Sequence, residues 1–169
     1  AYREMPATID ELGDLADRLE PLRDANLAHN GQLVAEAAAL GARVVCLGEL
    51  FAGPYFALEQ RDMWRGLAEP AADGPSSLFM QQVAREHKVV VVAPIYEDAG
   101  AGGRFNTALV IDETGELLGC YRKTHIPQGS NDVSSFFEEH YYQKSDGRAL
   151  TGAANISANP YFPVFRTSF

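Results

Sequence analysis

Two residues of opposite charge stand at the ends of apolar stretches that are far apart in the sequence. Glu49 follows the stretch VVCLG, and Lys123 follows LLGCYR. A carboxylate can accept and return a proton, while a fixed ammonium can stabilise negative charge that develops on a reacting oxygen. The active groups of α/β folds gather at the carboxyl ends of strands. The sequence therefore predicts that Glu49 and Lys123 line a common cavity.

The apolar patterns around these two residues predict strands. Valine-rich runs are typical of strands covered on both faces, and the later pair indicates a strand, a turn at Gly115 and a second strand. Residues 128–162 are rich in Gly, Ser and Asn and predict a long irregular segment, followed by one more strand at residues 163–169. The first four strands are expected at residues 43–51, 88–96, 105–111 and 117–123.

Helical spacing of apolar residues marks three further segments. A short helix is expected from residue 9 to residue 22, broken near Pro21, and a second pattern covers residues 24–40. Ser76 or Ser77 can cap a third helix between the first two strands. This order of elements predicts an α/β sandwich with a mixed sheet, in one domain that spans residues 1–169.

Composition favours a protein that acts on a small molecule. No apolar run approaches the roughly 18 residues of a membrane span, and the net charge of -9 disfavours binding to nucleic acid. The first residues, AYREMPATIDELG, do not resemble a secretory signal, so a cytoplasmic protein is expected. Two cysteines cannot form a disulfide framework, and the four histidines are too scattered to indicate a metal site.

Several motifs, in order, resemble the nitrilase superfamily of carbon-nitrogen hydrolases. VVCLGELF is similar to the glutamate motif of that family, and GCYRKTHIP is similar to its lysine motif. RFNTALVIDETGELLG resembles the strand pair before that lysine, and FPVFRTSF resembles a strand shortly before the nucleophile. RKTHIP followed by FFEEHYYQ looks most like the N-carbamoyl amide hydrolases, of the N-carbamoylputrescine amidase and beta-ureidopropionase type. The resemblance implies a nitrilase-like α-β-β-α sandwich with mixed sheets, of which this chain lacks the C-terminal part.

The resemblance also implies a reaction and its residues. The reaction is hydrolysis of a carbon-nitrogen bond in a small amide or an N-carbamoyl amine or amino acid, by a cysteine, a glutamate and a lysine, with no metal and no organic cofactor. Glu49 would be the general base, and Lys123 would stabilise the oxyanion. A second glutamate, which orients the lysine and the substrate, aligns best with Glu138, with Glu139 close behind.

Two further residues, on loops next to these motifs, are expected to bind substrate. They are Tyr55 and His125. An individual tyrosine or histidine more often packs or forms a hydrogen bond within the fold than it contacts a ligand, so the structural interpretation of each stays open.

The nucleophile is not expected on this chain. Cys46 precedes Glu49 by three residues and Cys120 precedes Lys123 by three, and an odd offset on a strand points two side chains to opposite faces. By the resemblance, the cysteine lies shortly beyond a segment like the one that ends at Phe169. We therefore expect a complementing chain or a homo-oligomer, and no turnover by this chain alone. A non-catalytic scaffold or assembly subunit is the alternative.

Overall fold

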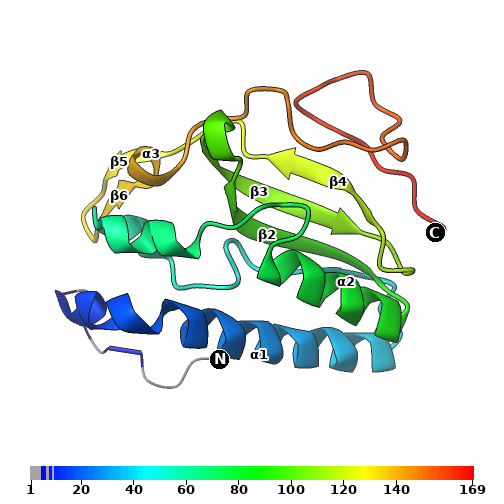
Figure 1. Ribbon diagram of the computed structural model, residues 1–169, viewed down its shortest axis with the longest axis horizontal. Helices are drawn as coiled ribbons and strands as arrows, with labels where there is room; N and C mark the ends of the chain where they lie inside the picture. Colours follow the sequence, from blue (N-terminus) through cyan, green and yellow to red (C-terminus); the bar gives the residue numbers. More distant parts are fainter. Residues whose placement is uncertain (1–4, 7, 9) are drawn as a thin grey trace.

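The structure is a computed structural model that describes residues 5–6, 8 and 10–169. Two α-helices lie side by side on one face of a four-stranded mixed sheet, and the segment after β4 returns across the other side of the molecule (Figure 1). This is the α/β fold with a mixed sheet that the sequence predicts. None of the helices in the described ranges is long and apolar enough to cross a lipid bilayer.

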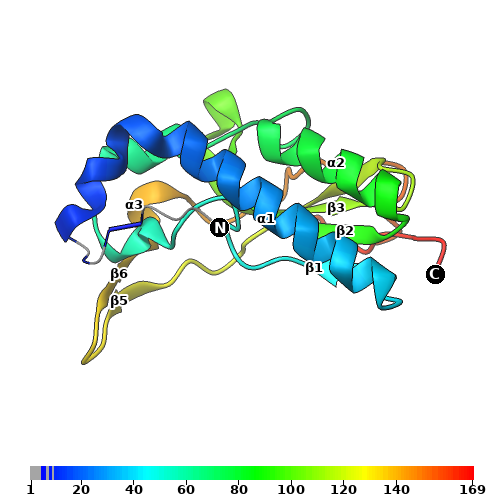
Figure 2. The same cartoon turned by 90° about the horizontal axis from the view of Figure 1, so that it is seen from below.

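The two N-terminal helices are consecutive in the chain. A 3-10 helix, η1 (Asp10–Arg18), leads directly into α1 (Leu19–Ala39), which extends along the whole molecule (Figure 2). The change of helix type lies at Arg18, whose φ of -126° is not helical, three residues before the predicted break near Pro21. Pro21 lies in the first turn of α1, where a missing N–H removes no α-helical hydrogen bond. Ile9, where the pattern predicts the helix to begin, lies outside the described residues.

The sheet has the order β1-β2-β3-β4. β1 runs parallel to β2, and the β2–β3 and β3–β4 pairs are antiparallel. Helix α2 (Pro75–His87) connects β1 to β2, and Gly115, with φ of 81°, supplies the predicted turn between β3 and β4. The strands are β1 (Val44–Cys46), β2 (Val90–Asp98), β3 (Arg104–Ile111) and β4 (Leu117–Arg122).

The first strand is shorter than predicted. It ends at Cys46, and the chain turns at Glu49 and Leu50, which has a left-handed φ of 50°. The Gly53 N–H donates to the Leu50 carbonyl at 3.0 Å and closes the turn. Glu49 therefore lies in a turn beyond the strand, and the alternation of strand side chains does not extend to it.

Helix α2 also begins differently from the prediction. Gly74 is its N-cap, and neither Ser76 nor Ser77 caps it. The Ser76 N–H donates at 2.7 Å to the buried carboxylate of Glu69 instead. A carboxylate from outside the helix thus satisfies a free N–H of its first turn, which suits the positive end of the helix dipole.

The main core lies between the sheet and helices α1 and α2. Alternate residues of β2, β3 and β4 point to the helices, because neighbouring side chains of a strand point to opposite faces. Burial of this apolar surface is the main source of stability for such a layer. The fully buried members of this core include Val34, Met80, Val91, Ile95, Leu109, Ile111 and Cys120.

A second buried group packs at the end of the sheet where β2 ends and β3 begins, and we call it the aromatic cluster. The ring centroids of Phe56 and Tyr141 are 4.8 Å apart in an edge-on arrangement, and those of Tyr96 and Tyr142 are 6.0 Å apart. Such aromatic pairs add stability beyond the area they bury. Its members are Phe56, Trp64, Tyr96, Tyr141 and Tyr142, and the short helices η2 (Phe56–Leu58) and η3 (Asp62–Leu67) contribute the first two.

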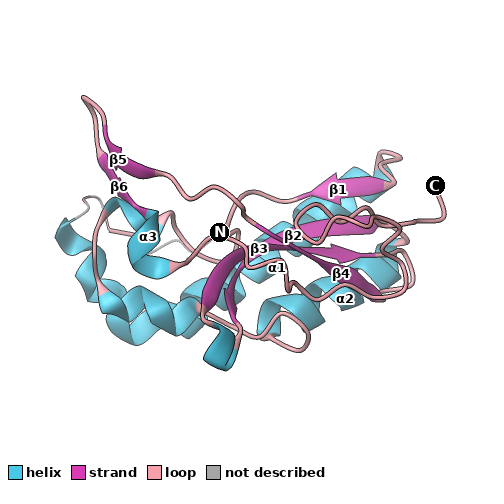
Figure 3. Ribbon diagram, turned by 90° about the horizontal axis from the view of Figure 1, so that it is seen from above, coloured by secondary structure: helices cyan, strands magenta, loops and turns pink. Residues whose placement is uncertain are grey.

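The segment after β4 is mostly irregular, as predicted, but it begins with regular elements. Strands β5 (Gln128–Ser130) and β6 (Ser135–Phe137) form a hairpin that projects from the molecule, and the one-turn helix α3 (Glu138–Tyr141) follows (Figure 3). The strand predicted at residues 163–169 is wrong. Phe165 makes only an isolated bridge to Asn155, and a strand needs a longer hydrogen-bonded partner than the described residues offer there.

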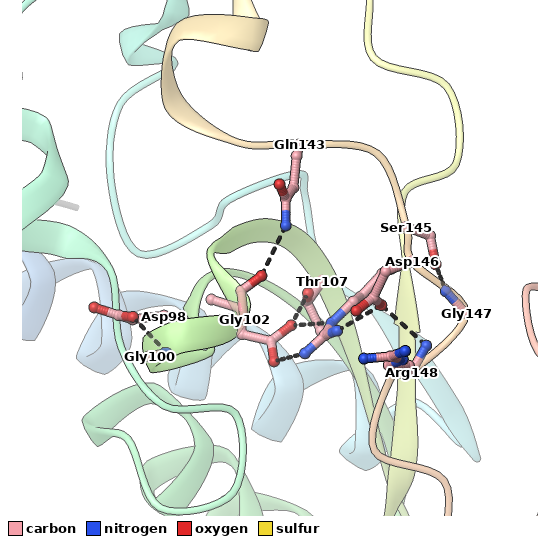
Figure 4. Close-up of polar contacts among 11 residues, drawn as sticks. Asp98, Gly100, Gly102, Thr107, Gln143, Ser145, Asp146, Gly147 and Arg148 are labelled. Atoms are coloured by element: carbon pink, nitrogen blue, oxygen red, sulfur yellow. Dashed lines mark hydrogen bonds and ion pairs between the residues drawn. The ribbon is translucent and has the colours of Figure 1, made fainter.

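A buried ion pair joins β2 to β4 next to the end of each strand. Arg122 binds the carboxylate of Glu97 through two nitrogens, at 2.6 and 2.8 Å, and both side chains are at most 7% exposed. Thr107 donates to Glu97, and Asp146 accepts from Arg122 at 2.9 Å (Figure 4). The pair is thus fully hydrogen-bonded, which a buried charge requires.

Substitution of Arg122 by methionine should destabilise the fold strongly. It would leave the Glu97 carboxylate buried without its counter-charge, which costs roughly 3–5 kcal/mol. Urea unfolding followed by circular dichroism measures the loss. Arg148→Met is the matched control, because the Arg148 side chain is exposed and should change the free energy of unfolding by less than about 0.5 kcal/mol. Equal effects of the two substitutions would contradict this account.

Candidate active site

Three charged side chains from separate parts of the chain meet at one end of the sheet. The Lys123 Nζ lies 2.8 Å from Glu49 Oε1 and 2.8 Å from Glu138 Oε2. Lys123 directly follows β4, Glu49 lies in the turn after β1, and Glu138 begins α3. The structure therefore brings together the two residues that the strand-end argument pairs, and it adds the glutamate that the family resemblance favours.

The backbone of Lys123 is held on both sides. Its N–H donates to the Asn106 carbonyl at 2.8 Å, and its carbonyl accepts the Ser145 N–H at 2.9 Å. The first bond continues the β3–β4 ladder by one residue, because Thr107 pairs with Arg122 in the register of those strands. Lys123 thus has the fixed position of a strand residue although it lies just outside β4.

Glu49 is held by its side chain. Asn106 Nδ2 donates to Glu49 Oε1 at 2.6 Å, and the same oxygen accepts from Lys123. Nothing in the described part of the chain bonds Oε2, and the side chain is 45% exposed. Glu49 therefore has one fixed oxygen and one oxygen open to a further partner.

Glu138 is the most buried of the three, with 3% of its side chain exposed. Its Oε1 accepts from the Tyr55 hydroxyl at 2.7 Å, while Oε2 accepts from Lys123. Helix α3 is fixed by the aromatic cluster, since the Tyr96 hydroxyl donates to the Tyr141 carbonyl at 2.8 Å. Tyr141 in turn accepts the Arg61 N–H at 2.9 Å. Packing of the cluster thus determines where the Glu138 carboxylate lies.

The neighbouring charges keep the Lys123 amine protonated. Burial by itself lowers the pKa of Lys123, but the hydrogen bonds and charges of Glu138 and Glu49 outweigh it, and the net pKa is raised. Burial raises the pKa of Tyr55 and Tyr142, and the Glu138 carboxylate adds to both shifts. At neutral pH the site thus holds a stable cation bordered by two neutral phenols, of which the Tyr55 hydroxyl donates a hydrogen bond to Glu138.

Sequence reasoning missed two members of this group. Asn106 lies in the middle of an apolar strand pattern, and Tyr142 is one of several aromatic residues near the predicted site motifs. The Asn106 amide also lies 3.5 Å from the Tyr142 hydroxyl. A polar residue at a covered position of a strand is the signal that could have pointed to Asn106, because a buried amide needs partners.

Of the other two predicted site residues, Tyr55 contacts the charged group and His125 lies outside it. His125 is exposed, and its Nδ1 lies 3.0 Å from Thr124 Oγ1. It lines an open cavity of about 470 Å³ together with Glu139 and Tyr142. The Tyr55 hydroxyl donates its hydrogen bond to Glu138, so substrate binding by Tyr55 and His125 stays a prediction.

The two cysteines do not reach this group. Cys120 is buried on the helix side of the sheet, and burial raises its thiol pKa to about 12. Cys46 pairs with Val92, four residues before Tyr96, so it lies roughly 13 Å along the sheet from the level of Asn106. The sequence argument from an odd offset does not hold for Cys46, since the strand ends before Glu49. Its position along the strand separates it from the site instead.

Known proteins resemble this chain in sequence and in fold. The carbon-nitrogen hydrolase family model matches residues 19–169. The chain is 35% identical over 144 residues to N-carbamoylputrescine amidase from Arabidopsis thaliana, which covers 85% of this chain and 42% of the relative. It is 32% identical over 162 residues to beta-ureidopropionase from the same plant, which covers 95% of this chain and 33% of the relative. A carbon-nitrogen hydrolase structure from Helicobacter pylori superposes with a TM-score of 0.64 and 27% identity, over 73% of this chain and 40% of that one.

The extent of these matches has two consequences. The chain spans less than half the length of each relative, so it corresponds to a part of the nitrilase fold. The family model nevertheless covers most of the chain, including Glu49, Lys123 and Glu138. The chain belongs to the carbon-nitrogen hydrolase family of the nitrilase superfamily.

Proposed function

We propose that this chain supplies the acid-base and oxyanion-stabilising half of a site that hydrolyses a carbon-nitrogen bond in a small amide or N-carbamoyl compound. The observation that carries the proposal is the Lys123 ammonium at 2.8 Å from both Glu49 and Glu138. Unlike the buried Arg122–Glu97 pair, this group has a member that is open to a further partner, because the Glu49 side chain is 45% exposed. Two carboxylates around one cation hold the ammonium in place and leave a net negative charge near a proton-transfer site.

The donor and acceptor atoms of the group that remain open fit the first half of the reaction. An ammonium has three N–H donors, and two of them bind Glu49 and Glu138, which leaves the third for a substrate oxygen. Glu49 Oε2 takes the proton of a thiol, and the thiolate attacks the carbonyl carbon. Negative charge moves to the carbonyl oxygen, where Lys123 stabilises it. The carbon-nitrogen bond then breaks, and the leaving nitrogen takes the proton from Glu49.

The second half uses the same groups again, with water in place of the thiol as the proton donor. Glu49 takes a proton from water, and the resulting hydroxide attacks the thioester that the first half leaves. Lys123 stabilises the second tetrahedral intermediate, and the carbon-sulfur bond breaks. The thiolate then recovers its proton from Glu49. A carboxylate with one open oxygen can transfer each of these protons in turn.

The nucleophilic cysteine is proposed to come from outside residues 1–169. Cys120 is buried in the core on the helix side of the sheet, and Cys46 lies too far along β1. A cysteine from a further part of the polypeptide, or from a complementing chain or second copy, would complete the site. The cytoplasm is the proposed location, because thiolate catalysis requires a reduced cysteine.

The proposed substrate class rests on the relatives. The two that match over most of this chain are named for N-carbamoylputrescine and for ureidopropionate, both of which are small N-carbamoyl compounds. Tyr55 and His125 are the residues of this chain that we propose to contact the substrate. Tyr55 borders the charged group, and His125 lines the neighbouring cavity.

Removal of the proposed base or cation should abolish most of the activity. We expect Glu49→Gln and Lys123→Ala each to lower kcat/KM by about 10²-fold or more, because one loses proton transfer and the other loses oxyanion stabilisation. Ammonia release from N-carbamoyl substrates measures the effect, in the complete protein or assembly that carries the nucleophile.

Matched controls separate this effect from a general loss of charge. Glu116→Gln removes an exposed carboxylate from the β3–β4 turn, and Lys88→Asn removes an exposed ammonium at a left-handed position that asparagine tolerates. Both should retain full activity. If activity is unchanged in both Glu49→Gln and Lys123→Ala, the catalytic assignment is wrong. An inactive wild-type assembly would favour the scaffold alternative.

Substitution of Glu138 by glutamine should lower the pKa of Lys123. Glu138 contributes the leading hydrogen bond and charge that raise this pKa. With a neutral glutamine in its place, less opposes the lowering of the Lys123 pKa by burial. A raised lysine pKa stabilises the fold at pH values below the unfolded pKa, and this stabilisation is lost as pH rises through the folded pKa. In Glu138→Gln the loss should therefore begin at lower pH.

Carbon-13 NMR titration of the lysine side chains measures this pKa. Glu139→Gln is the control, because Glu139 is the exposed neighbour in the same helix and does not contact Lys123. An unchanged Lys123 titration in Glu138→Gln, or an equal shift in both variants, would show that Glu138 is not the partner that matters.

A further inference from the structure

We propose that Asn106 is a positioning residue that orients the Glu49 carboxylate for proton transfer, an inference that rests on the proposed function. Asn106 Nδ2 donates to Glu49 Oε1 at 2.6 Å, and a hydrogen bond to a charged acceptor is stronger than one between neutral groups. The Asn106 bond fixes one oxygen of the proposed base. The other oxygen is left to exchange protons with the nucleophile, the leaving group and water.

Asn106 is itself rigidly placed. It lies within β3, is 6% exposed and pairs with Tyr96 of β2. Its carbonyl accepts the Lys123 N–H at 2.8 Å, so the same residue bonds the backbone of the proposed cation and the side chain of the proposed base. The distance between the two groups is therefore set through one strand residue of the sheet.

Glu49 needs such a fixed partner. It lies in a turn outside the sheet, and its side chain is almost half exposed. Lys123 also binds it, but an ammonium on a flexible stem imposes little direction on its acceptor. The planar amide of a buried asparagine has few rotatable bonds and donates in a fixed direction, so it limits the rotation of the carboxylate more strongly.

The surroundings determine which way the Asn106 amide points. A carboxylate only accepts hydrogen bonds, so the NH₂ group rather than the oxygen must face Glu49. The Tyr142 hydroxyl lies 3.5 Å from the same nitrogen. The charged or titratable groups around Glu49 are Lys123 from the end of β4, Glu138 from α3, and the hydroxyls of Tyr55 and Tyr142.

Two substitutions at Asn106 separate orientation from packing. Asn106→Leu keeps a similar volume without a donor, and Asn106→Asp keeps the shape but places a second carboxylate against Glu49. In the complete enzyme, we expect kcat to fall about 10²-fold with little change in KM, since a misplaced catalytic group costs about that factor. The acid limb of the pH profile of kcat/KM should move to higher pH, and further for Asp than for Leu, because the carboxylate loses a donor or gains a like charge.

Two comparisons decide the proposal. Asn30→Leu replaces an asparagine whose side chain donates to the Asn26 carbonyl within α1, and it should leave the acid limb in place. In the Glu49→Gln background, Asn106→Leu should cost little further activity, because the carboxylate that it orients is gone. A fall in kcat with an unmoved acid limb, or full additivity with Glu49→Gln, would show that Asn106 has only a structural role.

A readout that needs no turnover separates this proposal from the proposed function. The side-chain amide protons of Asn106 should exchange slowly with solvent in NMR spectra and should shift and exchange faster in Glu49→Ala. Spectra that are identical in the two proteins would overturn the contact, whether or not the enzyme is active. Absent hydrolysis by the wild type, with the amide effect present, would count against the proposed reaction and not against the contact.

Discussion

The site depends on a single ammonium that is partly buried between two carboxylates. Removal of Lys123 from water disfavours its charge, and the bonds to Glu49 and Glu138 more than restore it, so the pKa rises. The three groups come from three segments that are separate in the sequence. Their attraction is strong only if each segment is fixed, because flexible side chains lose entropy when they pair. The rest of the fold can be understood as the means of fixing them.

Each of the three segments is fixed by a different kind of contact. Lys123 extends the β3–β4 ladder, and the buried Arg122–Glu97 pair ties the preceding residue of β4 to β2. Helix α3 has only one turn and is too short to be stable alone, so Glu138 depends on the aromatic cluster below it. Glu49 lies in a turn and depends on side-chain bonds. Lys123 is thus held by the strand ladder, Glu138 by packing and Glu49 by side-chain bonds alone. Glu49, the proposed base, is therefore the least constrained of the three.

The strands, the order of the helices and the two site motifs could be predicted from local patterns. The valine-rich run gives β2 to within two residues, and the run FNTALVI gives β3 to within one, because these strands are mostly apolar and largely covered on both faces. The end of β1 could not be predicted. The turn has Leu50 in a left-handed conformation, and leucine, unlike glycine or asparagine, does not indicate such a conformation. The strand expected at 163–169 has the right residues but no partner ladder among the described residues, and a partner is a property of the whole fold.

The polar partners of the site are less predictable than its charges, for a physical reason. A lysine or glutamate after an apolar strand stands out, because the cost of burying it demands an explanation. Asn106 and Tyr142 fit strand and packing patterns, and they bind the site only because β3 and the segment after α3 converge there. Yet Asn106 contacts both proposed catalytic groups, one through its side chain and one through its backbone. A charge pattern can therefore identify which groups react, whereas the residue that sets their mutual orientation emerges only from the register of the sheet.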